Sequence, residues 1–422
     1  ALGTSLGAGY VMASLFPADS AIRQWQFDLV ALDFIREGLH LRVNLVSIIA
    51  TGFLLLTFAL QHHGAARAAN FQKILGIACM LPLLLVGLVP LITGDLPREN
   101  LFPILPILRD AAGNIGFGAW DAAGLTLLAG AMFGAGWSTY GFETAVCYTR
   151  EFKNPAKDTA RAIFASGLLC MAIFTLVPLV FQASLGLEGM LDPSIYDGSG
   201  VANALAKILG GGAVIGNLLI VMLVLALLLI VMTSMMGSSR TLYQASVDGW
   251  FPRYLSRVNS HGAPTAAMWT DLVFNLVLLL ASDYFAVLMI SNVCYFVFNF
   301  LNLQSGWIHR IDRSDRNRPY RCPTWLLATG AVFGFVNMVW MGAGADVWGE
   351  GTLRNGLLAV LLIIPVFAYR HYVQDKGQFP ISDGDGEGGV AQQAVQPKAG
   401  VLPYLALIAA AATVGLSAYF AA

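Results

Sequence analysis

The sequence has little charge for its length. Only 12% of its 422 residues are Asp, Glu, Lys or Arg, whereas 57% are apolar. A soluble domain carries roughly twice that share of charged residues, so a soluble globular protein is excluded. The net charge of −1 says nothing about partners. We expect a small-molecule substrate and the lipid bilayer as partners, and no nucleic acid.

The sequence also lacks the patterns of a disulfide framework and of a metal centre. Its five cysteines have no paired spacing and mostly lie in or beside apolar segments, which argues against a secreted disulfide scaffold. Its six histidines lie near segment ends or in loops, without the HxxxH spacing of a metal site. We therefore expect neither a metal nor another cofactor.

Long apolar runs dominate what is present, and the mean hydropathy is +0.68. A bilayer-spanning helix needs about 20 apolar residues, and runs of this length recur throughout the chain. They predict an all-α polytopic membrane protein with about eleven transmembrane helices. The spans are expected at about 2–17, 41–61, 71–94, 124–147, 160–184, 213–239, 264–281, 284–305, 324–345, 355–370 and 402–420.

The basic residues predict the orientation of these spans. Most of the 24 Lys and Arg residues fall in every second loop. Because cytoplasmic loops are enriched in Lys and Arg, these loops are predicted to be cytoplasmic, in a multi-pass protein of the plasma (inner) membrane. The basic loops lie around 62–73, 150–161, 240–257, 310–321 and 370–398.

One stretch, 131–158, breaks two rules of a membrane helix. Gly134, Gly136 and Gly141 each weaken a helix by about 1 kcal/mol relative to alanine. Glu143 puts a carboxylate at membrane depth, which is costly unless the side chain faces a cavity or a partner. We therefore predict that the helix is unwound here and that the unwound part forms a binding site.

The unwound part offers several kinds of binding group. An interrupted helix leaves backbone N–H and C=O groups without partners, and its two ends carry partial charges that suit a zwitterion. Trp137 and Tyr140 are predicted to cover the site as a flat lid against water. Ser138 and Thr139 offer hydroxyl groups. Glu143 either faces the cavity or makes a buried structural hydrogen bond.

Four other polar residues inside the spans are weaker candidates. Ser5, Ser234 and Asn292 are candidates for the wall of the site, and helix packing or interhelical hydrogen bonding is their alternative role. Asp271 lies a turn or two inside the cytoplasmic end of its span. At that depth it is expected to reach water or to cap a neighbouring helix.

Three motifs resemble the amino acid–polyamine–organocation (APC) transporter superfamily. The stretch FGAGWSTYGFETAVCYTREFKNPAKDTARAI, residues 133–163, is similar to the sixth helix and following loop of these transporters. The stretch SSRTLYQASVDGWFPRYLSRVNSHGAPTAAM, residues 238–268, is similar to the loop after their eighth helix. The stretch RNRPYRCP, residues 316–323, resembles their Arg-Pro-Tyr-Arg-x-Pro signature.

The resemblance implies the leucine-transporter-type fold of two inverted five-helix repeats. It makes 2–17 the third helix of the family, so the first two helices are expected to be missing and the first repeat incomplete at the N-terminus. In the family, the first helix holds the substrate carboxylate and the sixth helix meets the amino group and side chain. The resemblance therefore implies that this chain holds the second half of the site.

One departure from the family bears on energy coupling. Many members have a lysine in the fifth helix whose ammonium group replaces a sodium ion. Cys79 stands at that place here, and Lys73 lies nearly two turns closer to the cytoplasm. This departure leaves Glu143 as the candidate for a proton-linked switch.

The resemblance covers a transporter core at 1–370. Composition predicts a cytoplasmic low-complexity linker at 371–401 and, from the last apolar run, an additional transmembrane helix at 402–422. The resemblance implies a permease, not an enzyme, that moves amino acids or related amines by alternating access and is coupled to protons or to counter-substrate. Two alternatives stay open. One is a receptor or sensor with a transporter fold, and the other is an intramembrane hydrolase that pairs Glu143 with Asp271.

Overall fold

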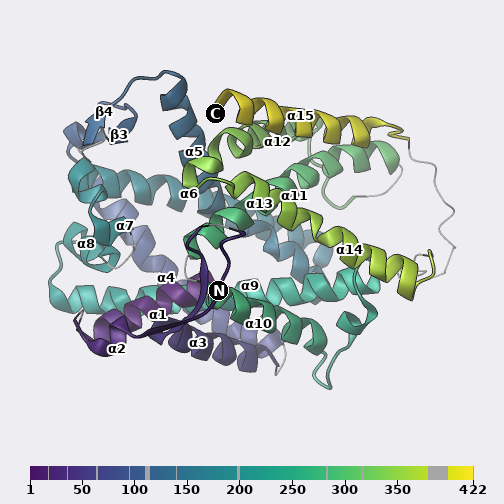
Figure 1. The fold of residues 1–422 in the computed structure, drawn as a ribbon, viewed down its shortest axis with the longest axis horizontal. Coiled ribbons are helices and arrows are strands. Elements are labelled where there is room, and N and C mark those ends of the chain that lie inside the picture. Colours follow the sequence, from purple (N-terminus) through teal and green to yellow (C-terminus); the bar gives the residue numbers. More distant parts are fainter. Residues whose placement is uncertain are drawn as a thin grey trace. The chain divides into compact units, whose positions relative to one another are not determined.

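The fold is given by a computed structural model of the chain (Figure 1). It describes residues 1–17, 19–35, 37–62, 65–94, 96–109, 115–138, 140–196, 200–281, 284–314, 318–378 and 398–421. The chain folds into two compact units. The first unit comprises Ala1–Ile104, Phe142–Arg150 and Ile163–Tyr284, and the second comprises Leu105–Gly141, Glu151–Ala162 and Phe285–Ala422.

Helices form most of the first unit. Its longer helices are α1 (Leu2–Leu15), α3 (Leu45–His62), α4 (Ala65–Thr93), α6 (Pro155–Met190, whose first residues belong to the second unit), α9 (Ala213–Val247) and α10 (Thr265–Leu279). Its short elements are α2 (Ala21–Gln24), α7 (Pro193–Tyr196), α8 (Val201–Ile208), the 3-10 helices η1 (Arg98–Leu101), η2 (Phe142–Glu151) and η3 (Arg253–Ser256), and the strands β1 (Gln26–Ala31) and β2 (His40–Asn44).

The second unit is also mainly helical. Its helices are α5 (Ala122–Ser138), α11 (Tyr284–Asp312), α12 (Thr324–Gly344), α13 (Thr352–Leu361), α14 (Ile363–Ala368) and α15 (Leu402–Ala421). It also contains the 3-10 helix η4 (Asp346–Trp348), a π-helical turn η5 (Tyr369–Gln374) and the strands β3 (Ile107–Arg109) and β4 (Ile115–Phe117).

The predicted polytopic membrane fold is confirmed. Among the described residues, 8 helices are long and apolar enough to cross a membrane, and α5 and α10 are shorter apolar helices. Together with α1, these helices occupy the eleven predicted spans. Several of them extend further than predicted, among them α6 from Pro155 to Met190, α9 to Val247 and α11 to Asp312. A helix keeps its backbone hydrogen bonds after its apolar run ends, so hydropathy underestimates its length.

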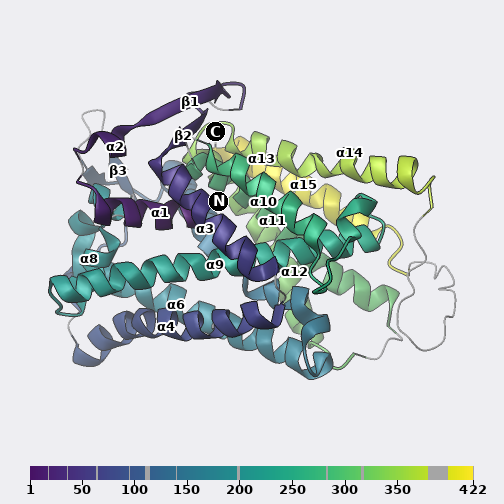
Figure 2. The same cartoon turned by 90° about the horizontal axis from the view of Figure 1, so that it is seen from below.

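The sequence did not predict two small β-hairpins between the helices. Strand β1 pairs with β2 in antiparallel fashion, and Gln26 lies opposite Asn44 (Figure 2). The side chain of Arg42 on β2 bonds to Asp28 on β1, with 2.5 Å between Nε and Oδ1. The hydrogen bond from this guanidinium group holds the pKa of Asp28 below its usual range. Strands β3 and β4 form the second hairpin.

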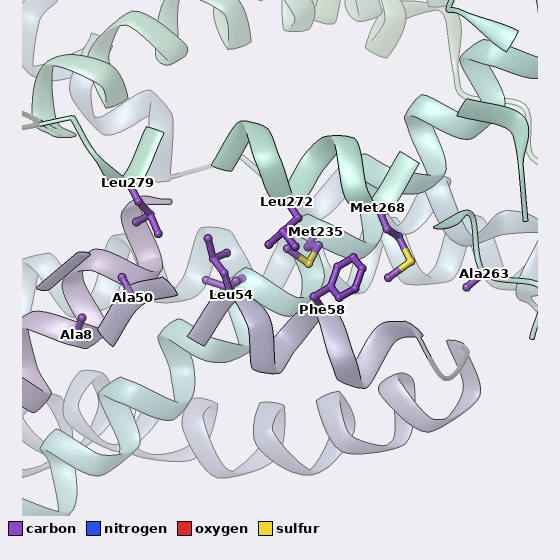
Figure 3. Packing of buried hydrophobic residues seen from close by; sticks show 10 residues of the cluster. Ala8, Ala50, Leu54, Phe58, Met235, Ala263, Met268, Leu272 and Leu279 are labelled. Atoms are coloured by element: carbon purple, nitrogen blue, oxygen red, sulfur yellow. The ribbon is translucent and has the colours of Figure 1, made fainter. Parts of the chain in front are cut away.

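A buried apolar cluster joins four helices of the first unit (Figure 3). Leu54 of α3 and Leu272 of α10 are each 1% exposed, and Ala8 of α1 is fully buried. Met235 of α9 lies beside Leu272 in Figure 3. Lipid tails are as apolar as these side chains, so close packing rather than expulsion of water stabilises such contacts within a bilayer.

In the second unit, α12 packs against both α5 and α15. Close approach to α15 requires a glycine at position 342, because a Cβ atom there would overlap the Ser417 hydroxyl and lie 2.5 Å from the Val414 carbonyl oxygen. On the α5 side, Trp348 of η4 donates a 2.8 Å hydrogen bond from Nε1 to the carbonyl oxygen of Gly130. The close approach at Gly342 shows that α15, the helix predicted at the C-terminus, packs tightly on α12.

Candidate functional site

The predicted interruption is present at the end of α5. The α-helix ends at Ser138, and the next regular element is the 3-10 helix η2, which begins at Phe142. Between them, Gly141 has a φ of +110°. Residues with a Cβ atom rarely adopt this φ value, so the backbone path requires glycine at this position.

The two other glycines singled out in the sequence have a different role. The α-helix continues through Gly134 and Gly136 to Ser138. A Cβ atom at Gly134 would lie 2.5 Å from the Trp348 ring, and one at Gly136 would lie 2.8 Å from the Phe296 ring. These two glycines therefore let aromatic side chains approach the helix backbone, and only Gly141 belongs to the interruption itself.

The aromatic residues near the interruption differ in their surroundings. Tyr140 stacks on Tyr295 of α11, with ring centroids 4.1 Å apart and planes 7° apart. It also meets Phe296 edge to face, at 6.1 Å and 82°. Trp137, in contrast, is 40% exposed. Tyr140 is therefore part of a packed aromatic wall, whereas the Trp137 ring has an open face.

Side-chain hydrogen bonds engage two carbonyl groups in the last turns of α5. The Ser138 hydroxyl donates to the carbonyl oxygen of Ala135 at 2.6 Å. Asn292 of α11 is fully buried, and its Nδ2 donates to the carbonyl oxygen of Phe133 at 2.6 Å. Its Oδ1 is buried without a hydrogen-bond partner among the described residues. Asn292 thus joins α11 to α5 about one turn before the interruption.

Two further residues predicted for the site, Thr139 and Glu143, are not fully described by the structure. Thr139 lies outside the described residues. Glu143 belongs to the 3-10 helix η2, but its side chain lies outside the described part of the chain. The roles predicted for these two residues stay predictions.

Ser5 and Ser234 lie in the first unit. Ser5 is 4% exposed on α1, a helix that packs against α3 and α9. Gly3, on the same helix, allows this close packing, because a Cβ atom there would lie 3.2 Å from Val231 Cγ2. Ser234 is exposed on α9. These surroundings favour helix packing as the role of Ser5 and leave Ser234 on the surface of its unit.

The residues that the structure brings together are Trp137, Ser138, Tyr140, Gly141 and Asn292, all in the second unit. Sequence reasoning missed Tyr295 and Phe296. Their spacing from Asn292 is three and four residues, which puts all three on one face of a helix. This periodicity was the available signal that the three residues act together, although it does not indicate which helix that face packs against.

Comparison with known proteins assigns the family. A model of the amino acid permease family matches residues 1–365. The chain belongs to this family. Permeases are transporters, so the chain is a multi-pass membrane protein of a transporter family. It is not an enzyme, which excludes the intramembrane hydrolase.

Two relatives illustrate the similarity. The branched-chain amino acid permease BcaP of Lactococcus lactis subsp. cremoris is 25% identical over 334 residues, which cover 77% of this chain and 66% of that permease. An uncharacterized transporter of Legionella pneumophila is 28% identical over 187 residues, or 43% of this chain and 37% of the relative. The chain thus spans less than two thirds of either relative's length.

Proposed function

We propose that the protein is a secondary active transporter of amino acids or related amines in the plasma (inner) membrane, working by alternating access and coupled to protons or to counter-substrate. The observation that carries the proposal is the interruption of α5 between Ser138 and Phe142, with Gly141 at a φ of +110°. Interrupted helices near the bilayer midplane are where transporters of this kind hold substrates.

The end of α5 is suited to an ammonium group. The last carbonyl groups of a helix have no intrahelical donors and carry the negative end of the helix dipole. In our proposal, carbonyl oxygens around 137–141 receive the substrate ammonium. Trp137 acts as an aromatic gate and Gly141 as the hinge. Glu143 is a polar anchor or a proton-linked switch.

The aromatic wall suggests which side chain the substrate carries. Tyr140, Tyr295 and Phe296 lie against one another beside the interruption and present ring surfaces. Such a wall suits an aliphatic side chain better than a charged one. The relative in Lactococcus is a branched-chain amino acid permease by name. We therefore propose leucine, isoleucine and valine as the first substrates to test.

The test is counterflow in proteoliposomes. Vesicles containing the protein are loaded with unlabelled leucine and supplied with labelled leucine outside. Transport predicts transient accumulation of label that vesicles without protein do not show, with competition by isoleucine and valine but not by lysine or glutamate. Saturable binding without counterflow would favour the sensor alternative, and absence of both for every amino acid and amine tested would overturn the proposal.

A further inference from the structure

A second ionisable group is buried away from the α5 interruption. Asp271 of α10 is only 8% exposed, and its Oδ2 has no hydrogen-bond partner among the described residues. It lies six residues after the start of its helix at Thr265, or about 9 Å along the axis. The sequence predicted that Asp271 reaches water or caps a neighbouring helix. Its burial shows that it does not reach water from the end of its helix.

The surroundings of Asp271 are largely apolar. Its helical neighbours Met268 and Leu272 belong to the buried cluster of Figure 3. The polar group that acts on its side chain is the Ser238 hydroxyl of α9, which itself donates to the Met235 carbonyl oxygen at 3.2 Å. Asn275, one turn further along α10, donates from Nδ2 to the backbone oxygen of Asp271 at 2.9 Å and does not serve the carboxylate.

Little positive charge is available to compensate an ionised Asp271. Among the described residues, no charged side chain acts on it; its helix neighbour Asn275 accepts a 2.9 Å hydrogen bond at Oδ1 from the backbone nitrogen of Ala1. The elements packed against α10 are α3, α9 and η3. Their titratable or charged side chains are His62, Arg240, Tyr243, Arg253 and Tyr254. Of these, Arg240 donates to the Met236 carbonyl and Tyr254 contacts Thr270.

An ionised carboxylate in such a place is costly. Burying a charge costs several kcal/mol even after relaxation, and leaving it unpaired retains most of that cost. A buried carboxyl group without a counter-charge therefore tends to bind a proton. A proton needs no additional space and no further ligand, so it is the occupant that fits the unpartnered Oδ2.

We propose that Asp271 is a proton-binding site whose occupancy changes during the transport cycle. This inference rests on the proposed transport function. Asp271 and Ser238 belong to different helices, α10 and α9, so relative movement of these helices changes the hydrogen bonding and solvation of the carboxylate.

The first test does not depend on transport. Infrared spectroscopy of the protein with ¹³C-labelled aspartate separates the C=O stretch of a protonated carboxylic acid from the bands of ionised carboxylates. We expect a labelled protonated-acid band near neutral pH that is lost in Asp271→Glu, whose new side chain is unlabelled. A wild-type protein without this band, or a band that persists in Asp271→Glu, would overturn the inference.

The second test measures coupling in proteoliposomes. One coupled proton allows a gradient of one pH unit to drive about tenfold accumulation of substrate. Asp271→Asn mimics the protonated form, so we expect leucine counterflow within about twofold of wild type but an accumulation ratio near 1. The exposed control Asp28→Asn should accumulate as wild type does.

The outcomes separate the inference from the proposed function. Gradient-driven accumulation by Asp271→Asn, or counterflow without any gradient-driven accumulation in wild type, would overturn the inference and leave the transport function intact. No counterflow by wild type would count against the transport function itself, and the infrared measurement would still test proton binding. If Asp271→Asn does not fold, the Asp271→Glu spectrum decides.

Discussion

Replacing Gly141 by alanine isolates the backbone conformation at the interruption. Among the described residues, a Cβ atom at this position would meet nothing within 4 Å, so the substitution creates no steric overlap with them. Its only direct consequence is an alanine at a φ of +110°, outside the regions that residues with a Cβ atom favour. Holding such a residue in a sparsely populated conformation costs about 1–3 kcal/mol.

A cost of about 2 kcal/mol corresponds to about a thirtyfold change in an equilibrium constant. If the interruption must keep this conformation for substrate to bind, Gly141→Ala should lower leucine counterflow by about thirtyfold. The midpoint of thermal unfolding in detergent should fall to the extent that the folded protein keeps the strained backbone, and counterflow should fall to the extent that it relaxes to another conformation, because the two losses share one cost. Both quantities are measured on the same preparation.

The matched control is Gly52→Ala in the middle of α3. A Cβ atom there also meets nothing within 4 Å, and Gly52 is not among the positive-φ glycines of the described chain. This substitution should leave counterflow unchanged and, if anything, stabilise the helix by up to about 1 kcal/mol. If Gly141→Ala behaves like Gly52→Ala in both assays, the argument from the φ angle is wrong.

Three further predictions concern the packing around the site. Trp137→Ala should weaken substrate retention by roughly threefold to tenfold, from the loss of one aromatic contact; unaltered affinity and exchange rates would argue against a gate. Asn292→Ala should lower the free energy of unfolding by about 1–3 kcal/mol, because its carbonyl acceptor on α5 loses a buried donor; an unshifted denaturation midpoint would contradict this. Gly342→Leu on α12 should displace α15 by overlapping Ser417 and should therefore raise hydrogen exchange across α15. The control Gly415→Ala on α15, where a Cβ atom meets none of the described residues within 4 Å, should leave that exchange unchanged.

The long helices and the interruption of α5 could be predicted because both depend on local sequence. Apolar length alone predicts a spanning helix, and Gly141 followed by Glu143 marks a place where a regular helix is unfavourable. The hairpin of β3 and β4 was missed because its strands, Ile107–Arg109 and Ile115–Phe117, have three residues each and are too short to show a period-2 pattern.

The partners of the site residues depend on which helix faces which, and one sequence does not contain that information directly. Asn292 was predicted as a polar wall residue, but its bond to the Phe133 carbonyl follows from the packing of α11 on α5. Gly134 and Gly136 were predicted to loosen α5. Their neighbours are the rings of Trp348 and Phe296, which come from distant parts of the chain, so the two glycines accommodate packing.

The two carboxylates within the predicted spans lead to a last prediction. Sequence reasoning ranks Glu143 above Asp271, because Glu143 lies beside a helix break. The same position makes Glu143 suited to contact the substrate ammonium, and a hydrogen bond to a charged group is worth about 1.5–3 kcal/mol. Asp271 instead lies buried beside an apolar cluster, and its Oδ2 has no hydrogen-bond partner in the part of the chain that the structure describes, which suits a group that binds and releases a proton.

Glu143→Gln should therefore raise the KM for leucine by about tenfold to a hundredfold, by the loss of that interaction, while one pH unit still drives accumulation at saturating substrate. Asp271→Asn should show the reverse, with an unchanged KM and no accumulation. If Glu143→Gln abolishes accumulation at an unchanged KM, the proton-linked switch belongs to the α5 interruption. Because both variants replace a carboxylate by its amide, they differ only in where the charge is removed, and the comparison tests the division of roles directly.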